Sequence, residues 1–365
     1  MALRYGIVGL PNVGKSTLFN ALSNGKAVAA NFPFCTIEPN VGVVTVPDER
    51  MEQLASVVNP QKVTPTFIEF VDIAGLVKGA SQGEGLGNQF LANIREVDAI
   101  VHVVRCFQND QVIHVAGTVD PAFDKAVIDH ELQMKDLETV QKRMAKVEKV
   151  AKTGDKDAQQ ELSLLEQFVA QFTQGGNARD VAVESSQATL IKSWQLLTTK
   201  PVLYMANVDE ETLRKGTNEH VAQLKEAVKE EHAEVVLVCA ELESQLAELP
   251  PDEQQLFLQD YSLQSSALEV LIRASYQLLD LITYFTAGPQ EVRAWTIKAG
   301  TKAPQAAGVI HSDFERGFIK AEVIKLADYL HYKTELACRE AGKVSMEGKN
   351  YTVEDGDIVH FRFNV

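Results

Sequence analysis

The chain has 365 residues and a formal net charge of −15, with 45% apolar and 23% charged residues. This composition is ordinary for a globular protein of two or three domains and excludes a disordered chain, a collagen and a disulfide-rich miniprotein. The charge argues against nucleic-acid binding over the whole surface, and most of the excess acid lies in residues 201–280, which hold 5 basic and 16 acidic side chains.

Short apolar strand patterns alternate with helical stretches through the first 120 residues and again after residue 200. Gly9–Gly14 predicts a turn and Lys15–Leu22 a helix between the first two strands. The predicted strands, in chain order, are Leu3–Val8, Val41–Val46, Phe67–Val71, Ala99–Val104, Pro201–Ala206 and Glu234–Val238. Strands separated by helices form a mostly parallel sheet with helices on both faces, so we expect an α/β domain made of residues 1–120 and 200–280.

Two segments break this alternation. Between Arg105 and Pro201 lie 95 residues, whereas a crossover between parallel strands needs only about 30. Apolar spacing predicts two long helices there that turn at Thr153–Asp155. Residues 121–199 are therefore expected to form an inserted helical hairpin with coiled-coil character, and helices packed flat on the sheet are the alternative. Short strand patterns at the end of the chain predict a compact α+β module over residues 281–365.

The first turn carries a phosphate-binding motif. Residues 9–16 (GLPNVGKS) match GxxxxGK[ST] between a predicted strand and a predicted helix. In such a loop the backbone N–H groups surround phosphate at a helix N-terminus, a lysine reaches the β and γ phosphates, and the hydroxyl of Ser16 binds Mg²⁺. The predicted nucleotide-binding residues of this loop are Asn12, Val13, Gly14, Lys15, Ser16 and Thr17.

Two further elements are typical of a nucleotide site with Mg²⁺. The stretch Asp72–Gly75 (DIAG) ends a predicted strand, where the Asp72 carboxylate would hold Mg²⁺ directly or through water and the Gly75 N–H would approach the γ-phosphate. Thr36 lies in the loop between the first helix and the second strand, from which its hydroxyl would join the metal ligands. A lone threonine or DxxG is common, so these assignments depend on the order of the motifs along the chain.

The base-reading element is expected directly after the predicted strand 201–206. P-loop proteins that read guanine carry NKxD there, and the aspartate accepts two hydrogen bonds from the base. The stretch Asn207–Glu210 (NVDE) has Val208 in place of the lysine and Glu210 in place of the aspartate. Sites built on hydrogen bonds discriminate strongly, so this change predicts a relaxed base preference or a preference for adenine. Cys239–Glu241 follows the last predicted strand and is expected to close over the base.

The group that orients the attacking water is not evident, because Leu76 occupies the position after DxxG where a glutamine usually stands. One route is a monovalent cation such as K⁺, held beside the phosphates with the help of the Asn12 amide oxygen. A second route is catalysis by His114, if the Phe107–Gly117 loop folds over the nucleotide. A plain surface histidine is an equally good interpretation of His114.

Together these stretches resemble the Obg-related YchF group, the Obg-like ATPases, over nearly the whole chain. The resemblance is carried by Gly9–Ser16, Asn31–Glu38, Asn207–Glu210 and, most specifically, residues 72–91 (DIAGLVKGASQGEGLGNQFL). It implies a P-loop NTPase domain, an inserted helical hairpin and a C-terminal TGS domain of the β-grasp type, which Phe318–Ala321 and residues 355–364 resemble. It also implies hydrolysis of ATP in preference to GTP and association with ribosomes. Cys239 departs from the serine that many relatives carry.

Three functions remain open. The chain is an ATPase whose γ-phosphate orders Thr36 and residues 72–91 as a switch, a GTP switch that tolerates Glu210, or a nucleotide-gated module that binds a ribosome or RNA with little turnover. We expect a monomer. No apolar run is long enough to span a membrane, the first residues lack signal-peptide regions, and four scattered cysteines form no CxxC pair. A cytoplasmic protein without a membrane partner is therefore expected.

Overall fold

The computed structural model describes residues 3–23, 40–73, 86–109, 111–112, 114–115, 117–261 and 263–364. The chain forms two compact units, the first made of Met1–Val44 and Glu69–Ala274 and the second of Thr45–Ile68 and Ser275–Val365. This division differs from the expected boundaries in three respects: residues 45–68 share a unit with the C-terminal residues, that unit resumes at Ser275 and not at residue 281, and residues 121–199 are not separated from the first unit. Among the described residues, no helix combines the length and apolarity needed to cross a membrane.

The first unit is organised around a six-stranded sheet with the strand order β2-β4-β1-β5-β6-β7. Its strands are β1 (Arg4–Val8), β2 (Val41–Thr45), β4 (Phe67–Asp72), β5 (Ala99–Arg105), β6 (Val202–Asn207) and β7 (Val235–Val238). Every neighbouring pair from β4 to β7 is parallel, as predicted. The central strands β5 and β6 are buried along their whole length, which explains why their sequences are nearly continuous apolar runs.

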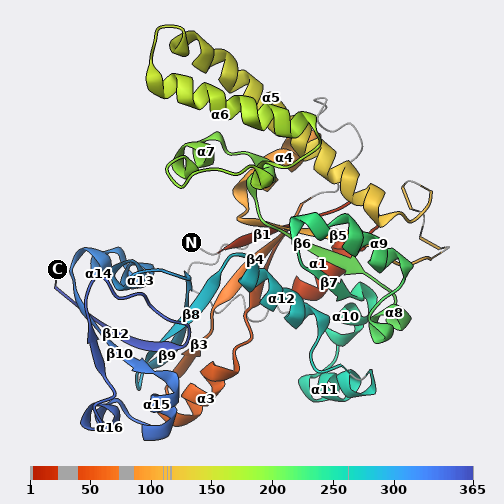
Figure 1. The fold of residues 1–365 in the computed structure, drawn as a ribbon. Helices are drawn as coiled ribbons and strands as arrows, with labels where there is room; N and C mark the ends of the chain where they lie inside the picture. Colours follow the sequence, from red (N-terminus) through yellow and green to blue (C-terminus); the bar gives the residue numbers. More distant parts are fainter. Residues whose placement is uncertain are drawn as a thin grey trace. The chain divides into compact units, whose positions relative to one another are not determined.

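Helices cover both faces of this sheet (Figure 1). Outside the insertion they are α1 (Lys15–Ser23), α4 (Leu86–Glu96), α8 (Glu210–Lys215), α9 (Glu219–Ala227), α10 (Ala240–Leu246), α11 (Pro251–Asp260) and α12 (Ala267–Leu278), with the 3₁₀ turn η4 (Lys229–Glu231). Helix α1 packs against α10, and α4 packs against β1. The carboxyl ends of parallel strands lie at one edge of a sheet, so the segments that follow β1, β5, β6 and β7 meet there.

The insertion is a helical hairpin, as predicted. Helices α5 (Pro121–Ala151) and α6 (Lys156–Thr173) pack along each other and are joined by residues 152–155. Asp120 starts α5 by accepting a hydrogen bond from the Phe123 N–H, with proline at the first helical position. The insertion continues through η2 (Ala178–Asp180), α7 (Ala188–Trp194) and η3 (Leu197–Thr199). Its apolar core includes the rings of Phe168 and Trp194, which meet edge to face with centroids 5.3 Å apart.

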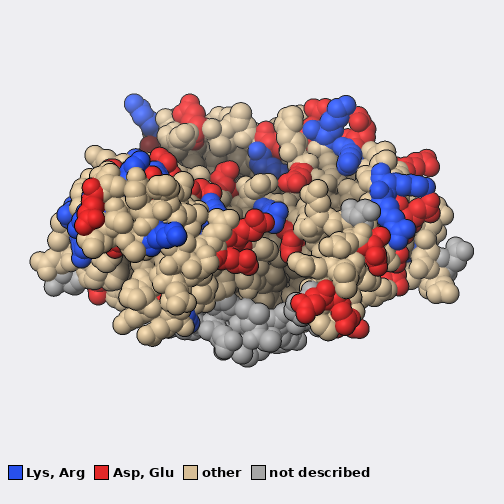
Figure 2. Space-filling view, turned by 90° about the horizontal axis from the view of Figure 1, so that it is seen from below, with Lys and Arg blue, Asp and Glu red and all other residues tan. Residues whose placement is uncertain are grey.

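A mostly buried ion cluster joins the start of α5 to the sheet. Lys125 of α5 lies 2.5 Å from both Asp129 and Glu231, and Glu231 also pairs with Arg179 at 2.7 Å. The Tyr204 hydroxyl of β6 donates to the same glutamate over 3.0 Å. Buried charges must be paired, so the cluster favours one arrangement of the start of α5. On the surface, acidic and basic side chains are interspersed over the face drawn in Figure 2 and do not gather in one cluster there.

The second unit is built on a six-stranded mixed sheet with the order β11-β10-β12-β8-β9-β3. Its strands are β3 (Lys62–Thr64), β8 (Leu281–Ala287), β9 (Glu291–Lys298), β10 (Phe318–Lys325), β11 (Ser345–Glu347) and β12 (Asp357–Phe363). Its helices are α3 (Glu49–Val58), α13 (Ala303–Ile310), α14 (Ser312–Arg316), α15 (Leu326–Tyr332) and α16 (Glu335–Glu340). The pairs β12–β8 and β3–β9 are parallel and the others are antiparallel.

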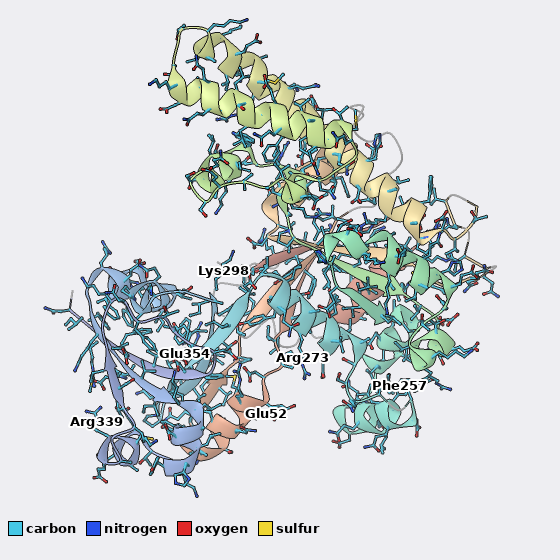
Figure 3. All side chains as sticks on the ribbon, viewed as in Figure 1. Glu52, Phe257, Arg273, Lys298, Arg339 and Glu354 are labelled. Atoms are coloured by element: carbon cyan, nitrogen blue, oxygen red, sulfur yellow. The ribbon has the colours of Figure 1, made fainter. Side chains whose placement is uncertain are left out.

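Both faces of this second sheet carry an apolar core. Helices α13 and α14 pack on one core, while α3, α15 and α16 pack on the other. Met51 and Leu54 of α3 belong to the same buried cluster as Phe285 and Ile358. Figure 3 shows the side chains of this unit, with Arg339 of α16 labelled. The predicted α+β module is therefore present, and α3 and β3, which no local pattern assigned to it, complete it.

Candidate functional site

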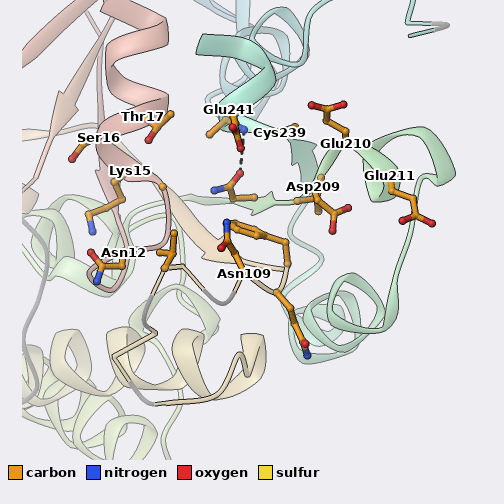
Figure 4. A pocket seen from close by; sticks show the side chains of 17 residues that line it. Asn12, Lys15, Ser16, Thr17, Asn109, Asp209, Glu210, Glu211, Cys239 and Glu241 are labelled. Atoms are coloured by element: carbon orange, nitrogen blue, oxygen red, sulfur yellow. Dashed lines mark hydrogen bonds between the residues drawn. The ribbon is translucent and has the colours of Figure 1, made fainter. Parts of the chain in front are cut away.

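A cavity of about 740 Å³ lies where the segments after β1, β5, β6 and β7 meet. It is lined by residues 12 and 14–17, 107–109 and 112, 207–211, and 239–241. Figure 4 shows Asn12 and Lys15 on one side of the cavity and Asp209 and Glu210 on the other. The structure thus brings the phosphate loop and the expected base-reading segment together in one site.

The phosphate loop joins β1 to α1, and its backbone has φ angles that few residue types adopt. Asn12 has a φ of 62° and Gly14 a φ of 98°, both in the left-handed region. A Cβ atom on Gly14 would lie 2.2 Å from the Nδ2 atom of Asn207. Glycine is therefore required at position 14 both by the backbone angle and by the close approach of a neighbouring side chain.

Lys15 is held by its own loop. Its Nζ atom donates to the carbonyl oxygens of Gly9 (2.9 Å) and Leu10 (2.7 Å), and the residue is buried. Burial lowers the pKa of Lys15 to about 8, although the charge of Asp72 works in the opposite direction. A buried ammonium group gains from any anion placed beside it, so the geometry favours phosphate binding at this point.

Asp72 ends β4 and has the properties of a metal ligand. Its Oδ1 atom is buried and has no hydrogen-bond partner among the residues that the structure describes. Burial raises the pKa of Asp72, while Lys15 lowers it. An unsatisfied buried carboxylate oxygen is costly, and Mg²⁺ prefers oxygen ligands of this kind. Ser16 lines the cavity, so these two residues fit the predicted metal site.

Several predicted residues cannot be placed. Thr36, Gly75 and Leu76 lie outside the described residues, as does most of the 72–91 stretch. Their roles stay predictions.

Asn207 connects the two ends of the site. Its Nδ2 atom donates to the Val13 carbonyl over 2.9 Å, and its Oδ1 atom accepts a hydrogen bond from the Ala240 N–H over 3.1 Å. The side chain therefore ties the phosphate loop to the start of α10. The neighbouring Val208 is buried and presents an apolar surface to the cavity, in the position where guanine readers carry lysine.

The acidic residues after β6 have separate tasks. Asp209 caps α8 by accepting a hydrogen bond from the Thr212 N–H over 2.8 Å. Glu210 stands in the first turn of α8, and its Oε2 atom accepts a hydrogen bond from the Tyr261 hydroxyl over 3.1 Å. Cys239 and Glu241 line the same end of the cavity, and burial raises the pKa of the Cys239 thiol. The segment after β7 therefore lines the cavity, and its predicted closure over a base stays a prediction.

The remaining wall comes from the Phe107–Gly117 loop, which the sequence singled out only for His114, and it is formed by other residues of that loop. Phe107, Gln108, Asn109 and Val112 line the cavity, and Arg105 holds their loop in place. The guanidinium group of Arg105 donates to the carbonyl oxygens of Phe107 (3.1 Å), Asn109 (3.1 Å) and Val112 (2.8 Å), and the residue is only 1% exposed. The one available signal was an arginine at the end of an apolar strand.

His114 points to a different part of the molecule. Its residue is buried, and its Nε2 atom lies 2.9 Å from Oδ2 of Asp124 in the first turn of α5. Burial raises the pKa of Asp124, and the interaction with His114 lowers it. His114 is not among the residues that line the cavity, and it is not the surface histidine of the alternative interpretation. A role in orienting water would require the imidazole to leave Asp124.

Known proteins match this chain over its whole length. The "Ribosome-binding ATPase YchF" of Bacillus subtilis (strain 168) is 56% identical over 366 residues, and the protein of the same name from Escherichia coli O157:H7 is 54% identical over 365 residues. Both alignments cover 100% of each chain. The solved structure of the Schizosaccharomyces pombe YchF GTPase is 40% identical, has a TM-score of 0.89, and is matched over 99% of this chain and 97% of that chain.

Two family models match parts of the chain. One, described as "50S ribosome-binding GTPase", matches residues 4–149, and the YchF-GTPase_C model, described as "Protein of unknown function", matches residues 281–364. The fold is shared with a GTP binding protein from Pyrococcus horikoshii OT3, which is 19% identical with a TM-score of 0.61 over 99% of this chain and 100% of that chain. With more than half of its residues identical to full-length relatives, the chain belongs to the YchF family.

Proposed function

We propose that this protein binds and hydrolyses ATP in the cavity at the edge of the first sheet, and that this cycle controls its binding to the ribosome. The observation that carries the proposal is that a phosphate loop and the Asn207–Glu210 segment line one cavity. Full-length relatives at 54% and 56% identity are named ribosome-binding ATPases, which supports both parts of the proposal.

The base end favours ATP over GTP. Val208 offers an apolar contact to any base, whereas guanine recognition needs a carboxylate that accepts two hydrogen bonds. Glu210 supplies the carboxylate at the aspartate position of the NKxD pattern, and the Tyr261 hydroxyl orients it by donating to its Oε2 atom. A carboxylate that is one methylene longer and oriented by another side chain is poorly aligned with the two donors of guanine, and a misaligned donor is costly in a buried site.

The phosphate end would position the chain's own groups around the triphosphate. Lys15 would exchange the carbonyls of Gly9 and Leu10 for β and γ phosphate oxygens. Ser16, Asp72 and Thr36 would hold Mg²⁺, which when bound neutralises charge on the phosphates. The Gly75 N–H would contact the γ-phosphate. Release of that phosphate would free Thr36 and the loop after Asp72, as in other nucleotide switches.

Two routes to catalysis remain within the proposal. The Asn12 amide oxygen would help to hold K⁺ beside the phosphates, in which case turnover is faster in potassium than in sodium. His114 would orient water, in which case His114→Ala slows turnover at equal nucleotide affinity. Equal rates in the two salts would exclude the first route, and an unchanged rate in the variant would exclude the second.

The remaining parts of the chain would contact the ribosome. We divide the protein into a nucleotide domain, the inserted hairpin of residues 121–199 with coiled-coil character, and a TGS domain of the β-grasp type over residues 281–365 that also uses residues 45–68. The expected partner is the large ribosomal subunit or the 70S ribosome, and we expect the protein to contact RNA there. A monomer acting in the cytoplasm is consistent with this partner.

Calorimetric titration with non-hydrolysable ATP and GTP analogues, in the presence of Mg²⁺, tests the nucleotide proposal. Tighter binding of the ATP analogue supports it. Tighter binding of the GTP analogue would mean that Glu210 still reads guanine, and an ordinary GTP switch would replace the proposal. Equal binding would mean that the site does not select the base, and the excess of ATP over GTP in cells would then decide which nucleotide occupies it.

The third candidate function, a nucleotide-gated ribosome-binding or RNA-binding module with little turnover, is separated by a second experiment. ATP hydrolysis and ribosome co-sedimentation are measured on the same preparation, with the ATP analogue, with ADP and without nucleotide. Nucleotide-dependent co-sedimentation together with turnover supports the ATPase switch. Nucleotide-dependent co-sedimentation without turnover favours the module, and co-sedimentation that ignores the nucleotide contradicts both.

A further inference from the structure

The carboxylate of Glu210 is restrained by a side chain from another segment of the chain. The Tyr261 hydroxyl donates to its Oε2 atom over 3.1 Å, and both side chains are partly buried. Tyr261 follows α11 and reaches the first turn of α8, so two separate helical segments define the position of this carboxylate. Glu210 lines the cavity at the position where guanine readers place their aspartate.

The Tyr261 ring is itself held by its neighbours. The ring of Phe257, one helical turn earlier and labelled in Figure 3, stacks on it with centroids 4.9 Å apart and an angle of 29° between the planes. The guanidinium carbon of Arg214 lies 4.6 Å from the centroid of the same ring. Stacking and cation–π contacts of this kind orient an aromatic ring and therefore aim its hydroxyl group.

The chemistry of the bases gives this restraint a consequence. Guanine presents two donors side by side, N1–H and the N2 amino group, and one carboxylate accepts from both only when its two oxygens are aimed at them. Adenine presents an amino donor and a ring nitrogen that is an acceptor, and a carboxylate aimed at that acceptor would repel it. A carboxylate that is held through one oxygen is therefore poorly placed for guanine and is kept from approaching the adenine ring nitrogen.

We propose that Tyr261 is a specificity-determining residue of the nucleotide cavity, which disfavours guanine by holding the Glu210 carboxylate through Oε2. The inference rests on the proposed function, because it requires that a nucleotide base occupies this end of the cavity. Tyr261 acts through Glu210 and is a positioning residue. Its effect falls on the choice between bases and leaves the phosphate end unchanged.

The test measures dissociation constants for ADP and GDP by calorimetry on the full-length protein and on Tyr261→Phe. The variant keeps the ring between its neighbours and removes only the hydroxyl. The ratio of GDP affinity to ADP affinity is expected to rise about tenfold, the usual effect of one hydrogen bond to a charged group. In a Glu210→Ala background the same change is expected to leave the ratio unaltered. Tyr276→Phe is the matched control, because that hydroxyl bonds to Thr283 in the second unit.

The outcomes are distinguishable. An unchanged ratio in a folded Tyr261→Phe variant overturns the inference alone, and so does an equal change in the Glu210→Ala background. If Tyr261→Phe does not fold, Glu210→Asp withdraws the carboxylate from the hydroxyl by one methylene and is expected to move the ratio in the same direction. A full-length protein that binds neither nucleotide overturns the proposed function and this inference with it.

Discussion

The phosphate end of the cavity is one continuous stretch of chain, whereas the base end is assembled from three stretches that lie far apart in the sequence. At the phosphate end the geometry is mainly that of the backbone, with left-handed residues and a lysine held by carbonyls of its own loop. At the base end it depends on side chains that reach between segments, such as Asn207 and Tyr261. A short motif can encode the first kind of geometry, and only tertiary packing can create the second.

The largest effect is expected where the two ends touch. Gly14→Ala places a Cβ 2.2 Å from the Asn207 amide and imposes a φ of 98° on an L-residue. The free loop would relax away from this geometry, and restoring it on binding would cost about 3 kcal/mol, so ADP affinity measured by calorimetry should fall about 100-fold. Gly154→Ala is the matched control, because its φ of 91° is similar but nothing lies within 4 Å of the added Cβ. If both variants bind ADP normally, the two ends are not coupled through position 14.

Removing the tie between the two ends should have the next largest effect. Asn207→Ala leaves the Val13 carbonyl and the Ala240 N–H without their partner. At about 1 kcal/mol for each lost hydrogen bond, nucleotide affinity should fall about 30-fold for ADP and GDP alike. Asn177→Ala is the control, since this buried asparagine accepts from Gln133 in the inserted segment and should reduce only the melting temperature. A loss confined to one base would show that Asn207 reads the base directly.

The protonation state of Lys15 separates the phosphate end from the base end, because this side chain lies at the phosphate end alone. The pKa of Lys15 is lowered to about 8, so the side chain is charged below this pH and neutral above it. Only the charged form attracts phosphate. ADP affinity should therefore be constant up to about pH 7 and fall about tenfold between pH 7 and pH 9. Calorimetry from pH 6.5 to 9.5 checks this, and Lys15→Arg, which stays charged, should remove the slope. The same slope in Lys15→Arg would assign the titration to another group.

The smallest effect is expected at the wall of the base end that residues 107–112 form. Arg105→Lys cannot reproduce three hydrogen bonds to the carbonyls of Phe107, Asn109 and Val112, because a lysine lacks the planar fork. The loop should loosen, and nucleotide affinity should fall about fivefold, which corresponds to ~1 kcal/mol. The dependence of ADP affinity on pH described above should change little. Arg143→Lys, on the surface of the hairpin beside Glu161, should change neither quantity. An effect on the pH slope would indicate that the two ends are not separable.

The same comparison explains what the sequence could and could not predict. The strands, the phosphate loop and the hairpin follow from local patterns, since apolar runs, glycine spacing and helical periodicity are properties of neighbouring residues. The wall at 107–112 depends on a buried arginine whose partners are backbone carbonyls, which carry no residue-type signal. The contact between Glu210 and Tyr261 joins residues 51 positions apart. The buried position of His114 depends on Asp124 in the same way, since only packing decides which polar groups are enclosed together.

The position of residues 45–68 in the chain has a consequence for cutting and exchanging parts of this protein. Most of these residues come before β4, the strand that ends at Asp72, yet Met51 and Leu54 share a buried core with Phe285 and Ile358. A protease that cleaves once between residues 274 and 281 would therefore not release the C-terminal unit, because the two fragments still share that core. For the same reason, a truncation at residue 280 would expose an apolar face on α3, and its loss of ribosome binding would be uninformative. To exchange this unit between relatives, the segments 45–68 and 275–365 would have to be transferred together.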